Sequence, residues 1–441
     1  MLIETNIEVN LRSIEEFTRV MASELLEDKI NFEILKEDNL IKIRVESQKL
    51  NKNIEFSYID LENKIEDQVL TMCKIGLLKL LDKKYDWGSL MGVRPTKVLR
   101  RLLINSCDYK EARKILKDFY LVTDEKINLM ETVVKKELDL LDKEHINLYI
   151  GIPFCPTKCK YCSFASYEIN GGVGRFYNDF VEALLKEIQI VGDFLKTYSK
   201  KVSSIYFGGG TPSTLTEEDL ERVLKKLLEN IDMTDVKEFT FEAGREDSLN
   251  IKKLEIMKKY FVDRISLNPQ SFNLETLKRV NRRFNRENFD LIFKEAKKLE
   301  FIINMDLIIG LPEETTEEIL ETLSQLKDYN IDNLTIHCLA FKRASKLFKE
   351  SQERNSIDRA LIEKHIQKIV EEKSMKPYYM YRQKNIIEWG ENIGYSKEGK
   401  ESIFNIEMIE ENQNTMALGG GGISKIVIEE RNGIDYIERY V

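Results

Sequence analysis

The sequence predicts an α/β protein built around a parallel sheet: a partial (β/α)6 barrel with an α+β domain before it and a short extension after it. Two observations predict this fold class. Between about residues 148 and 340, short apolar runs alternate with amphipathic segments of helical length. Residues 1–140 lack this alternation and mix strands and helices in another order. A chain of 441 residues has room for two or three domains with large cores.

The first 142 residues are expected to form the N-terminal α+β domain, ending in a helical linker. Hydrophobic periodicity separates its strands from its helices. The expected elements are a strand at 3–10, a helix at 12–27, three strands within 30–60, a helix at 64–83, and two helices at 109–118 and 124–142. The segment WGSLMGVRPTKVL (87–99) connects the first part of this domain to the second.

Residues 143–345 are expected to form the barrel core. Its six strand-like runs are LYIGIPF (148–154), SSIYFGG (203–209), EFTFEAG (238–244), RISLNPQ (264–270), INMDLIIG (303–310) and LTIHCLA (334–340). Helices are expected between them, for example at 176–195, 217–230 and 315–329, with Thr216 and Thr315 or Thr316 as N-caps. Six β–α units in a row predict a parallel sheet with helices outside. Ligands of such a sheet gather at the carboxyl ends of its strands.

Residues 346–441 are expected to form the C-terminal extension. It contains a helix at 357–373, the segment MKPYYMYRQKN (375–385) and the glycine-rich segment TMALGGGGISKIVI (415–428). No internal repeat is present.

The composition is typical of a soluble cytoplasmic protein. Hydrophobic residues make up 42% and charged residues 33% of the chain, and the net charge is −8. The absence of a strongly basic block argues against a nucleic-acid partner. The apolar runs are too short and too often interrupted by charge for a membrane span, and the N-terminus lacks a signal-peptide pattern. Six cysteines, three of them clustered, fit a reducing compartment, and Cys73, Cys107 and Cys338 are expected in the core.

The clustered cysteines are Cys155, Cys159 and Cys162, in the run IPFCPTKCKYCSF. Four cysteines complete the coordination of a four-iron cluster, whereas three leave one iron open. An open iron can bind the amino and carboxylate groups of S-adenosylmethionine (SAM) and pass it an electron, which releases a 5′-deoxyadenosyl radical. The spacing therefore predicts a [4Fe–4S] cluster with SAM. The alternative is a zinc site that uses the same thiolates and a fourth ligand from elsewhere.

Further residues at the ends of the predicted strands favour the cluster over zinc. The run Gly208–Pro212 (GGGTP) lets the backbone approach a ligand closely, although a plain tight turn would have the same composition. Polar residues recur at successive strand ends, as a SAM pocket requires. The polar residues at the strand ends are Glu242, Gln270 and Asp306, and Arg282 lies in the segment after Gln270. Tyr149 in the first strand and Ile308, two residues after Asp306, complete the set.

These motifs together resemble the radical SAM family of oxygen-independent coproporphyrinogen III oxidases (coproporphyrinogen dehydrogenases). The shared motifs are YxxIPFCxxxCxYCxF, GGGTP, RISLxxQSF, VNRxF and DLIxGLP, with LGGGGIS near the C-terminus. WGxLxGVRPTK and YYMYRQKN point to the HemZ branch of the family.

The resemblance implies that Cys155, Cys159 and Cys162 bind the cluster. It implies a SAM site of Tyr149, Gly209, Gly210, Thr211, Glu242, Gln270, Arg282, Asp306 and Ile308, with backbone near Ala340. Among these, Tyr149, Glu242 and Arg282 are the expected catalytic residues. The implied reaction converts two propionates of coproporphyrinogen III to vinyl groups in oxygen-independent haem synthesis, with an electron donor such as flavodoxin or ferredoxin as partner.

Two other functions stay open. The first is a haem chaperone. Gly151 and Phe164 stand where the founding enzyme has a histidine and a further cysteine, and both residues also occur in haem chaperones that resemble it. A different radical SAM reaction on a tetrapyrrole is the second.

Cations suited to propionate carboxylates are Arg94, Lys97, Arg343, Arg382 and Lys384. Of the three histidines, His337 is the one placed at a strand's carboxyl end.

Overall fold

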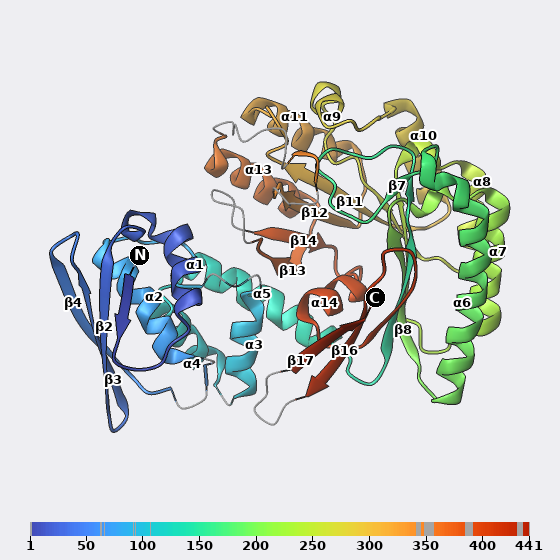
Figure 1. The fold of residues 1–441 in the computed structure, drawn as a ribbon. Coiled ribbons are helices and arrows are strands. Elements are labelled where there is room, and N and C mark those ends of the chain that lie inside the picture. The colour runs from blue at the N-terminus through green and yellow to red at the C-terminus, as the bar shows by residue number, and fades with distance from the viewer. Residues whose placement is uncertain are drawn as a thin grey trace. The chain divides into compact units, whose positions relative to one another are not determined.

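The chain divides into two units, Met1–Lys135 and Lys136–Val441, drawn as ribbons in Figure 1. The computed structural model describes residues 2–61, 64–65, 67–90, 92, 94–105, 107–340, 345–347, 357–383, 391–429 and 435–440. The division falls within helix α5 (Asp124–Leu140).

The smaller unit contains a four-stranded sheet in the order β1-β2-β3-β4. Its strands are β1 (Leu2–Thr5), β2 (Lys29–Glu37), β3 (Leu40–Ser47) and β4 (Lys52–Ile59). β1 is shorter than the expected strand at 3–10, because the side chain of Asn6 takes over the pairing with β2. Its Nδ2 donates to the carbonyl oxygen of Ile34, and its Oδ1 accepts from the amide of Ile34, both at 2.8 Å.

Helix α1 (Leu11–Met21) lies between β1 and β2 along the chain. The helices that follow the sheet are α2 (Gln68–Leu80), α3 (Thr96–Ile104) and α4 (Tyr109–Lys114), and α4 continues as a π-helical turn at Ile115–Phe119. α3 was not expected from the sequence. α2 packs directly on β3: a Cβ on Gly76 would lie 2.5 Å from Cγ2 of Val45, so only glycine permits this approach.

The larger unit is built on an eleven-stranded open sheet in the order β13-β14-β12-β11-β10-β9-β8-β5-β15-β16-β17. The six expected strands are present as β5 (Ile146–Ile152), β8 (Val202–Gly209), β9 (Glu238–Gly244), β10 (Arg264–Leu267), β11 (Ile302–Ile309) and β12 (Asn333–Cys338). Neighbouring strands among these six are parallel. The predicted fold class, a partial barrel with a parallel sheet, is confirmed.

Helices cover the outer face of this sheet (Figure 1). They are α6 (Tyr177–Thr197), α7 (Glu217–Asn230), α8 (Ile251–Lys259), α9 (Leu274–Arg279), α10 (Arg286–Lys298), α11 (Thr316–Gln325) and α13 (Arg359–Glu372). Short 3-10 turns of the larger unit lie at Gly172–Phe176, Pro212–Thr214, Glu246–Ser248 and Leu326–Asp328, and one of the smaller unit lies at Ser23–Leu25. Thr216 and Thr315 are N-caps as expected, and Thr315 forms a capping box with Glu318.

Residues after 374 add strands to both sides of the core sheet. They form β13 (Lys376–Tyr381), β14 (Asn392–Ser396), β15 (Thr415–Gly419), β16 (Ser424–Glu429) and β17 (Asp435–Tyr440), and the helix α14 (Ile403–Glu410). β14 pairs antiparallel with β12, whereas β15 pairs parallel with β5. The expected C-terminal extension is therefore part of the sheet.

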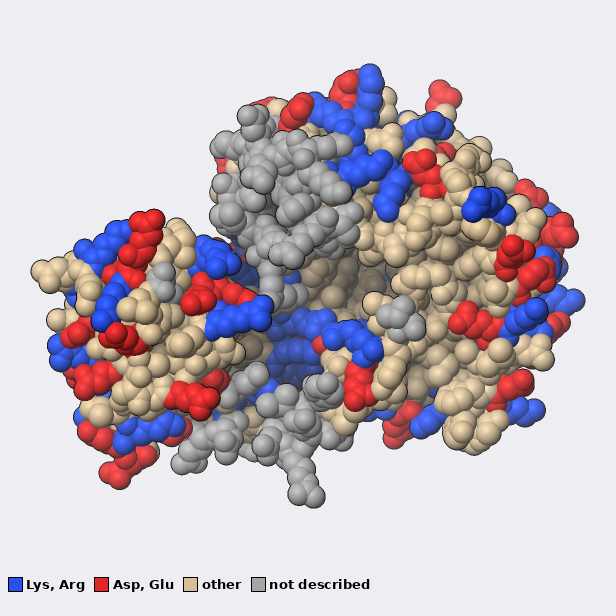
Figure 2. All heavy atoms as spheres, in the orientation of Figure 1, with Lys and Arg blue, Asp and Glu red and all other residues tan. Residues whose placement is uncertain are grey.

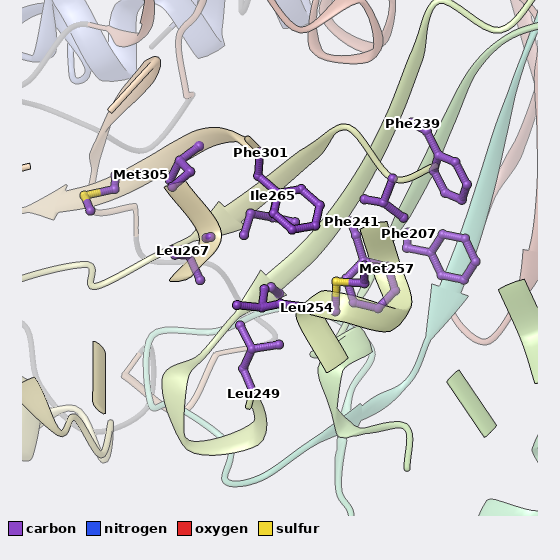
Figure 3. Packing of buried hydrophobic residues seen from close by; sticks show 14 of the residues in the cluster. Phe207, Phe239, Phe241, Leu249, Leu254, Met257, Ile265, Leu267, Phe301 and Met305 are labelled. Carbon is purple, nitrogen blue, oxygen red and sulfur yellow. The ribbon is translucent and has the colours of Figure 1, made fainter. Parts of the chain in front are cut away.

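The core of the larger unit lies between the sheet and its helices. Figure 3 shows Phe207 on β8 beside Phe239 and Phe241 on β9, with Leu254 and Met257 of α8 against them. The rings of Phe207 and Phe241 stack with centroids 5.2 Å apart. This packing fixes the spacing of the strands, and thereby the spacing of the side chains at their carboxyl ends. No helix in the described part of the chain has the length and apolarity needed to cross a membrane.

Candidate functional site

The three clustered cysteines lie in the loop that follows β5. This cluster loop runs from β6 (Phe154–Cys155) to β7 (Tyr167–Glu168), and the two short strands pair with each other. Cys155 and Cys159 are buried, whereas Cys162 is partly exposed. Burial and the neighbouring thiols of Cys159 and Cys155 raise the pKa of Cys162, so a metal that binds this thiol must displace its proton. Within the described residues, no three His, Cys, Asp or Glu side chains lie together as ligands of a single metal ion would.

The GGGTP run packs against the start of this loop. The amide of Gly210 donates to the carbonyl oxygen of Ile152 at 2.8 Å, and the amide of Thr211 donates to that of Phe154 at 2.7 Å. A Cβ on Gly210 would lie 2.5 Å from the Phe154 oxygen and 3.0 Å from Sγ of Cys155. Glycine is therefore required here, because any side chain would fill the space beside the first cysteine.

Arg245, which the sequence reasoning missed, holds the middle of the cluster loop. Its Nη1 donates to the carbonyl oxygen and the hydroxyl of Thr157 at 3.0 and 2.9 Å, and lies 4.0 Å from Sγ of Cys159. Asp247 pairs with the other edge of the guanidinium. The available signal was that this arginine directly follows the third strand-like run, because that position places it at the carboxyl edge of the sheet.

Arg282, expected in the SAM site, also faces the cluster loop. Its Nη2 donates to the carbonyl oxygens of Gly244, at 3.0 Å, and Asn268. The turn that carries Arg282 contacts the loop directly: the amide of Lys160 donates to the oxygen of Val280 at 2.9 Å. Arg282 thus joins the ends of β9 and β10 to the loop.

Glu242 and Asp306 form a carboxylate pair on the inner face of the sheet. Glu242 accepts hydrogen bonds from Tyr206, from Ser266 at 3.1 Å and from Asn268 at 3.2 Å. Burial and the negative charge of Asp306 raise the pKa of Glu242 to about 7. The sequence predicted both carboxylates at this edge, and the structure brings them together.

His337 lies next to Asp306 and joins the site to the C-terminal segment. Its Nε2 is 3.7 Å from Oδ2 of Asp306, and its Nδ1 is 3.2 Å from the hydroxyl of Tyr381 on β13. His145 instead pairs with Asp142, and His365 lies on the surface of α13. His337 is therefore the histidine that belongs to the site.

Gln270 and Ile308 meet at the mouth of this region. The amide of Ile308 donates to the carbonyl oxygen of Gln270 at 2.8 Å, and the amide of Gln270 donates to that of Asp306 at 3.0 Å. Gln270 has a positive φ of 68°, which non-glycine residues rarely adopt. Its side-chain Oε1 is buried and has no hydrogen-bond partner among the described residues. A buried acceptor without a partner can accept a hydrogen bond from a bound ligand.

Tyr149 belongs to an aromatic stack under the site. Its ring lies parallel to those of Tyr206 and Phe404, with centroids 6.3 and 6.1 Å away, and the latter two stack at 4.2 Å. Burial and the nearby charge of Glu242 raise the pKa of Tyr149 to about 12. Phe404 comes from α14, so this stack, like Tyr381, depends on the C-terminal segment.

The glycine-rich C-terminal segment supports the strand that leads into the cluster loop. Gly419 of β15 pairs with Gly151 of β5, and the amide of Gly420 donates to the oxygen of Gly151 at 2.8 Å. A Cβ on Gly151 would lie 2.4 Å from the oxygen of Gly420. A larger residue at position 151 therefore does not fit beside this segment.

The cations predicted to bind carboxylates have different positions. Arg382 directly follows β13 and Tyr381, and burial lowers its pKa. Arg94 and Lys97 belong to the smaller unit, just before and within α3. Arg343 and Lys384 lie outside the described residues.

Comparison with known proteins identifies the family. The model of the Radical SAM superfamily matches residues 149–326. The oxygen-independent coproporphyrinogen-III oxidase-like protein HemZ of Bacillus subtilis is 39% identical over 360 residues, which are 79% of this chain and 72% of HemZ. The chain belongs to the HemZ-like family of radical SAM proteins. As a member, it binds a [4Fe–4S] cluster and SAM.

Two other matches are narrower. The haem chaperone HemW of Buchnera aphidicola (subsp. Schizaphis graminum) is 30% identical over 197 residues, 45% of this chain and 51% of HemW. The solved structure of coproporphyrinogen III oxidase (HemN) from Escherichia coli superposes with a TM-score of 0.52 at 21% identity, covering 66% of this chain and 67% of HemN. The HemN match supports the fold.

Proposed function

We propose that this protein oxidatively decarboxylates coproporphyrinogen III in oxygen-independent haem synthesis. Each of two propionate side chains becomes a vinyl group, losing one carbon dioxide, one hydrogen atom and one further electron. The product is protoporphyrinogen IX. This reaction is a specific case of the broader role of HemZ-like radical SAM proteins in haem synthesis.

The observation that carries this proposal is the contact between Tyr381 and His337. Tyr381 belongs to the YYMYRQKN segment, which lies outside the barrel core and is shared with the HemZ branch. Its hydroxyl lies 3.2 Å from His337, which in turn lies beside Asp306. A segment typical of the oxidase-like branch therefore contributes a side chain to the candidate site, which a chaperone using the core alone would not need.

The residues present fit both cofactors. The space kept open by Gly210 beside Cys155 suits a cluster, which we assign to the thiolates of Cys155, Cys159 and Cys162. The buried, unpartnered Oε1 of Gln270 suits a donor group of SAM. Together with Gln270, the residues assigned to SAM are Tyr149, Gly209, Gly210, Thr211, Glu242, Asp306 and Ile308.

When bound, the reduced cluster and SAM supply a carbon radical that can abstract a hydrogen atom. The chain's own residues position and shield this chemistry. Glu242 and Asp306 offer carboxylate oxygens to hydroxyl or ammonium donors of SAM. Arg245 and Arg282 hold the cluster loop against the ends of β9 and β10. Arg282, proposed as catalytic, is therefore assigned a positioning role through the loop.

The propionate carboxylates require cations near the site. Arg382 follows Tyr381 at the end of β13, so its guanidinium is the candidate that lies closest in sequence to a site residue. Arginine binds a carboxylate through two parallel hydrogen bonds, which fixes the orientation of the propionate.

The test is an anaerobic incubation of the reconstituted protein with SAM, a reductant and coproporphyrinogen III, followed by mass spectrometry. We expect loss of two carbon dioxide units and four hydrogens, with 5′-deoxyadenosine formed alongside. Cleavage of SAM with an unchanged tetrapyrrole would contradict the proposed reaction. Tyr381→Phe serves as a site variant and His365→Gln as a control on the exposed face of α13.

A second candidate is haem binding for delivery to other proteins. The 30% identity to the haem chaperone HemW over 197 residues favours it. In that case the protein would bind haem stoichiometrically and yield no decarboxylated product in the same incubation. Absorbance titration with haem distinguishes the two functions.

A further inference from the structure

Beyond the SAM site, four large apolar or aromatic side chains are exposed in the cluster loop and in the 3-10 turn that follows it. We name the exposed side chains of Phe164, Tyr167, Val173 and Phe176 the cluster-loop patch. Their exposed fractions are 65%, 48%, 39% and 47%, although all are large apolar or aromatic residues. Exposed apolar surface rimmed by polar groups typically marks a contact site for another protein.

The chain holds this patch in a defined shape. The amide of Ser166 donates to the oxygen of Phe164 at 2.8 Å, and the amide of Tyr167 donates to that of Pro153 at 2.8 Å. Lys158 spans the loop, with its Nζ 3.0 Å from the oxygen of Ser166. The guanidinium of Arg175 lies over the ring of Phe176, 4.7 Å from its centroid. These contacts support the loop and the turn, while the four side chains of the patch stay exposed.

The surroundings of the patch carry more cations than anions, in a chain that is acidic overall. The turn at the end of α9 contacts the cluster loop, because Nδ2 of Asn281 donates to the oxygen of Lys158 at 3.0 Å. Arg282 in the turn after α9 is buried, Arg279 pairs with Glu313 and Glu318, and Lys278 lies near Glu275. The further cations of residues 156–176 and 277–284, all exposed or partly exposed, are Lys158, Lys160, Arg175 and Arg283, and the anion there is Glu168. The net charge of the whole chain is −8. Figure 2 shows Lys and Arg side chains, with some Asp and Glu among them, on the larger unit around the position of α9, beside an area that carries neither charge.

The patch also lies on the exposed side of the cysteines. Cys162 is the partly exposed member of the three, and Phe164 is two residues beyond it. An electron carrier that reaches Cys162 approaches the proposed cluster more closely than one that docks on the sheet's outer helices. No role in SAM or tetrapyrrole binding has been assigned to Phe164, Tyr167, Val173 or Phe176.

We propose that the cluster-loop patch is the docking surface for an acidic protein that carries one electron to the cluster. The donor is oxidised by one electron and the cluster is reduced by one, and no bond is made or broken. Charge complementarity selects this partner: an acidic surface would meet the basic rim, while the apolar centre supplies a short-lived contact. Electron-transfer complexes are among the smallest protein interfaces, which suits a patch of this size. The inference rests on the proposed cluster at Cys155, Cys159 and Cys162.

The test measures cluster reduction rather than turnover. Reconstituted full-length protein is mixed anaerobically with reduced flavodoxin, an acidic one-electron carrier, and bleaching of the cluster absorbance is followed by stopped flow. We expect Phe164→Ala/Phe176→Ala to lower the second-order rate constant about tenfold, because aromatic residues at the centre of an interface carry much of its energy. Reduction by dithionite, which needs no docking, should be unchanged.

The matched control is Phe194→Ala/Tyr198→Ala at the C-terminal end of α6. These two aromatic rings are 43% and 61% exposed and contact each other with centroids 4.6 Å apart, but they lie away from the cluster loop in the sequence and on a different element. Equal flavodoxin rates for the patch variant and the control would overturn the docking surface. If dithionite bleaches no cluster in the parent protein, the proposed cluster itself is wrong, so the two failures can be told apart.

Charge reversal tests the basic rim separately. Arg283 lies next to Arg282 on the turn that contacts the cluster loop, and the test variant is Arg283→Glu. The matched control is Lys252→Glu, at an exposed side chain of α8. We expect Arg283→Glu to slow reduction by flavodoxin about threefold at low ionic strength and to weaken its salt dependence. The role of the basic rim would be contradicted if Arg283→Glu raised the rate of reduction by flavodoxin, or if Lys252→Glu lowered it equally.

Discussion

Oδ2 of Asp306 and Nε2 of His337 lie 3.7 Å apart on the neighbouring parallel strands β11 and β12. Burial opposes ionisation of Asp306, but the contacts with His337 and with Asn304 outweigh it and hold the pKa of Asp306 below its usual value. The neighbouring Glu242 has a raised pKa, because burial and the charge of Asp306 both favour its neutral form. His337 thus keeps one of two adjacent carboxylates ionised.

Replacing His337 should weaken SAM binding at low pH. Without His337 burial of Asp306 is no longer offset and its pKa rises, so His337→Gln should bind SAM severalfold more weakly than the parent at pH 6. The difference should shrink at pH 8, where Asp306 is ionised in both proteins. Equilibrium dialysis measures the affinity, and His365→Gln on the surface of α13 is the control. A loss that is equal at both pH values would mean that His337 acts through packing alone.

The titration of Glu242 should appear in the SAM affinity of the parent protein. With a pKa of about 7, Glu242 is largely protonated at pH 6 and largely ionised at pH 8. A carboxylate that accepts hydrogen bonds from SAM must be ionised, so affinity should rise with pH through this range. Glu242→Gln should bind more weakly at pH 8 and show a flatter pH profile. An unaltered slope in Glu242→Gln would assign the titration to another group.

Removing one cysteine should abolish cluster assembly. Cys159→Ala should lower the iron content from about four per chain to well below one after reconstitution, because three thiolates are the fewest that hold an open four-iron cluster. Iron analysis and the visible charge-transfer band give the readout. Cys338→Ala, at a buried cysteine outside the loop, should retain the full band. A full band in Cys159→Ala would refute the ligand assignment.

Arg245 should stabilise both the fold and the cluster loop. Its side chain is 4% exposed and pairs with Asp247, so Arg245→Leu leaves a partly buried carboxylate unpaired. The free energy of unfolding should fall by about 3 kcal/mol, and iron incorporation should slow. The control Arg222→Ala breaks exposed pairs with Glu182 and Asp219 and should cost about 1 kcal/mol or less. Similar urea midpoints for the two variants would contradict this role.

A methyl group at position 151 should strain the strand that carries the cluster loop. The Cβ of Gly151→Ala would meet the oxygen of Gly420 at 2.4 Å, so backbone must move, at a cost of about 1–3 kcal/mol. Gly172→Ala is the control, since its Cβ meets no described atom within 4 Å. Thermal unfolding compares the two proteins. An unchanged melting temperature for Gly151→Ala would show that the glycine-rich segment yields easily.

The barrel core was predictable from the sequence because its signals are local. Each core strand is a short apolar run, and caps such as Thr216 and Thr315 mark where the next helix begins. Glu242, Gln270 and Asp306 were found because parallel strands place their carboxyl ends at one edge. The predicted family, fold class and cofactors are confirmed.

Other parts of the site depend on contacts between distant residues. Tyr381 meets His337, and Phe404 stacks on Tyr206, only after the segments that follow residue 374 join the sheet. Neither hydrophobic periodicity nor motif spacing shows which strand will pair with β5 or β12. Arg245 was missed for the same reason: its role comes from Thr157, almost ninety residues earlier in the chain.

The parallel pairing of β15 with β5 has a consequence for synthesis on the ribosome. β5, which leads into the cluster loop, pairs on one side with β8 and on the other with residues Thr415–Gly419. A nascent chain that has emerged only as far as β12 therefore leaves β5 as an edge strand, with unpaired backbone groups that can join other chains. The strand that leads into the cluster loop is completed by a segment that is translated long after it, so a chain terminated before Thr415 exposes it to aggregation.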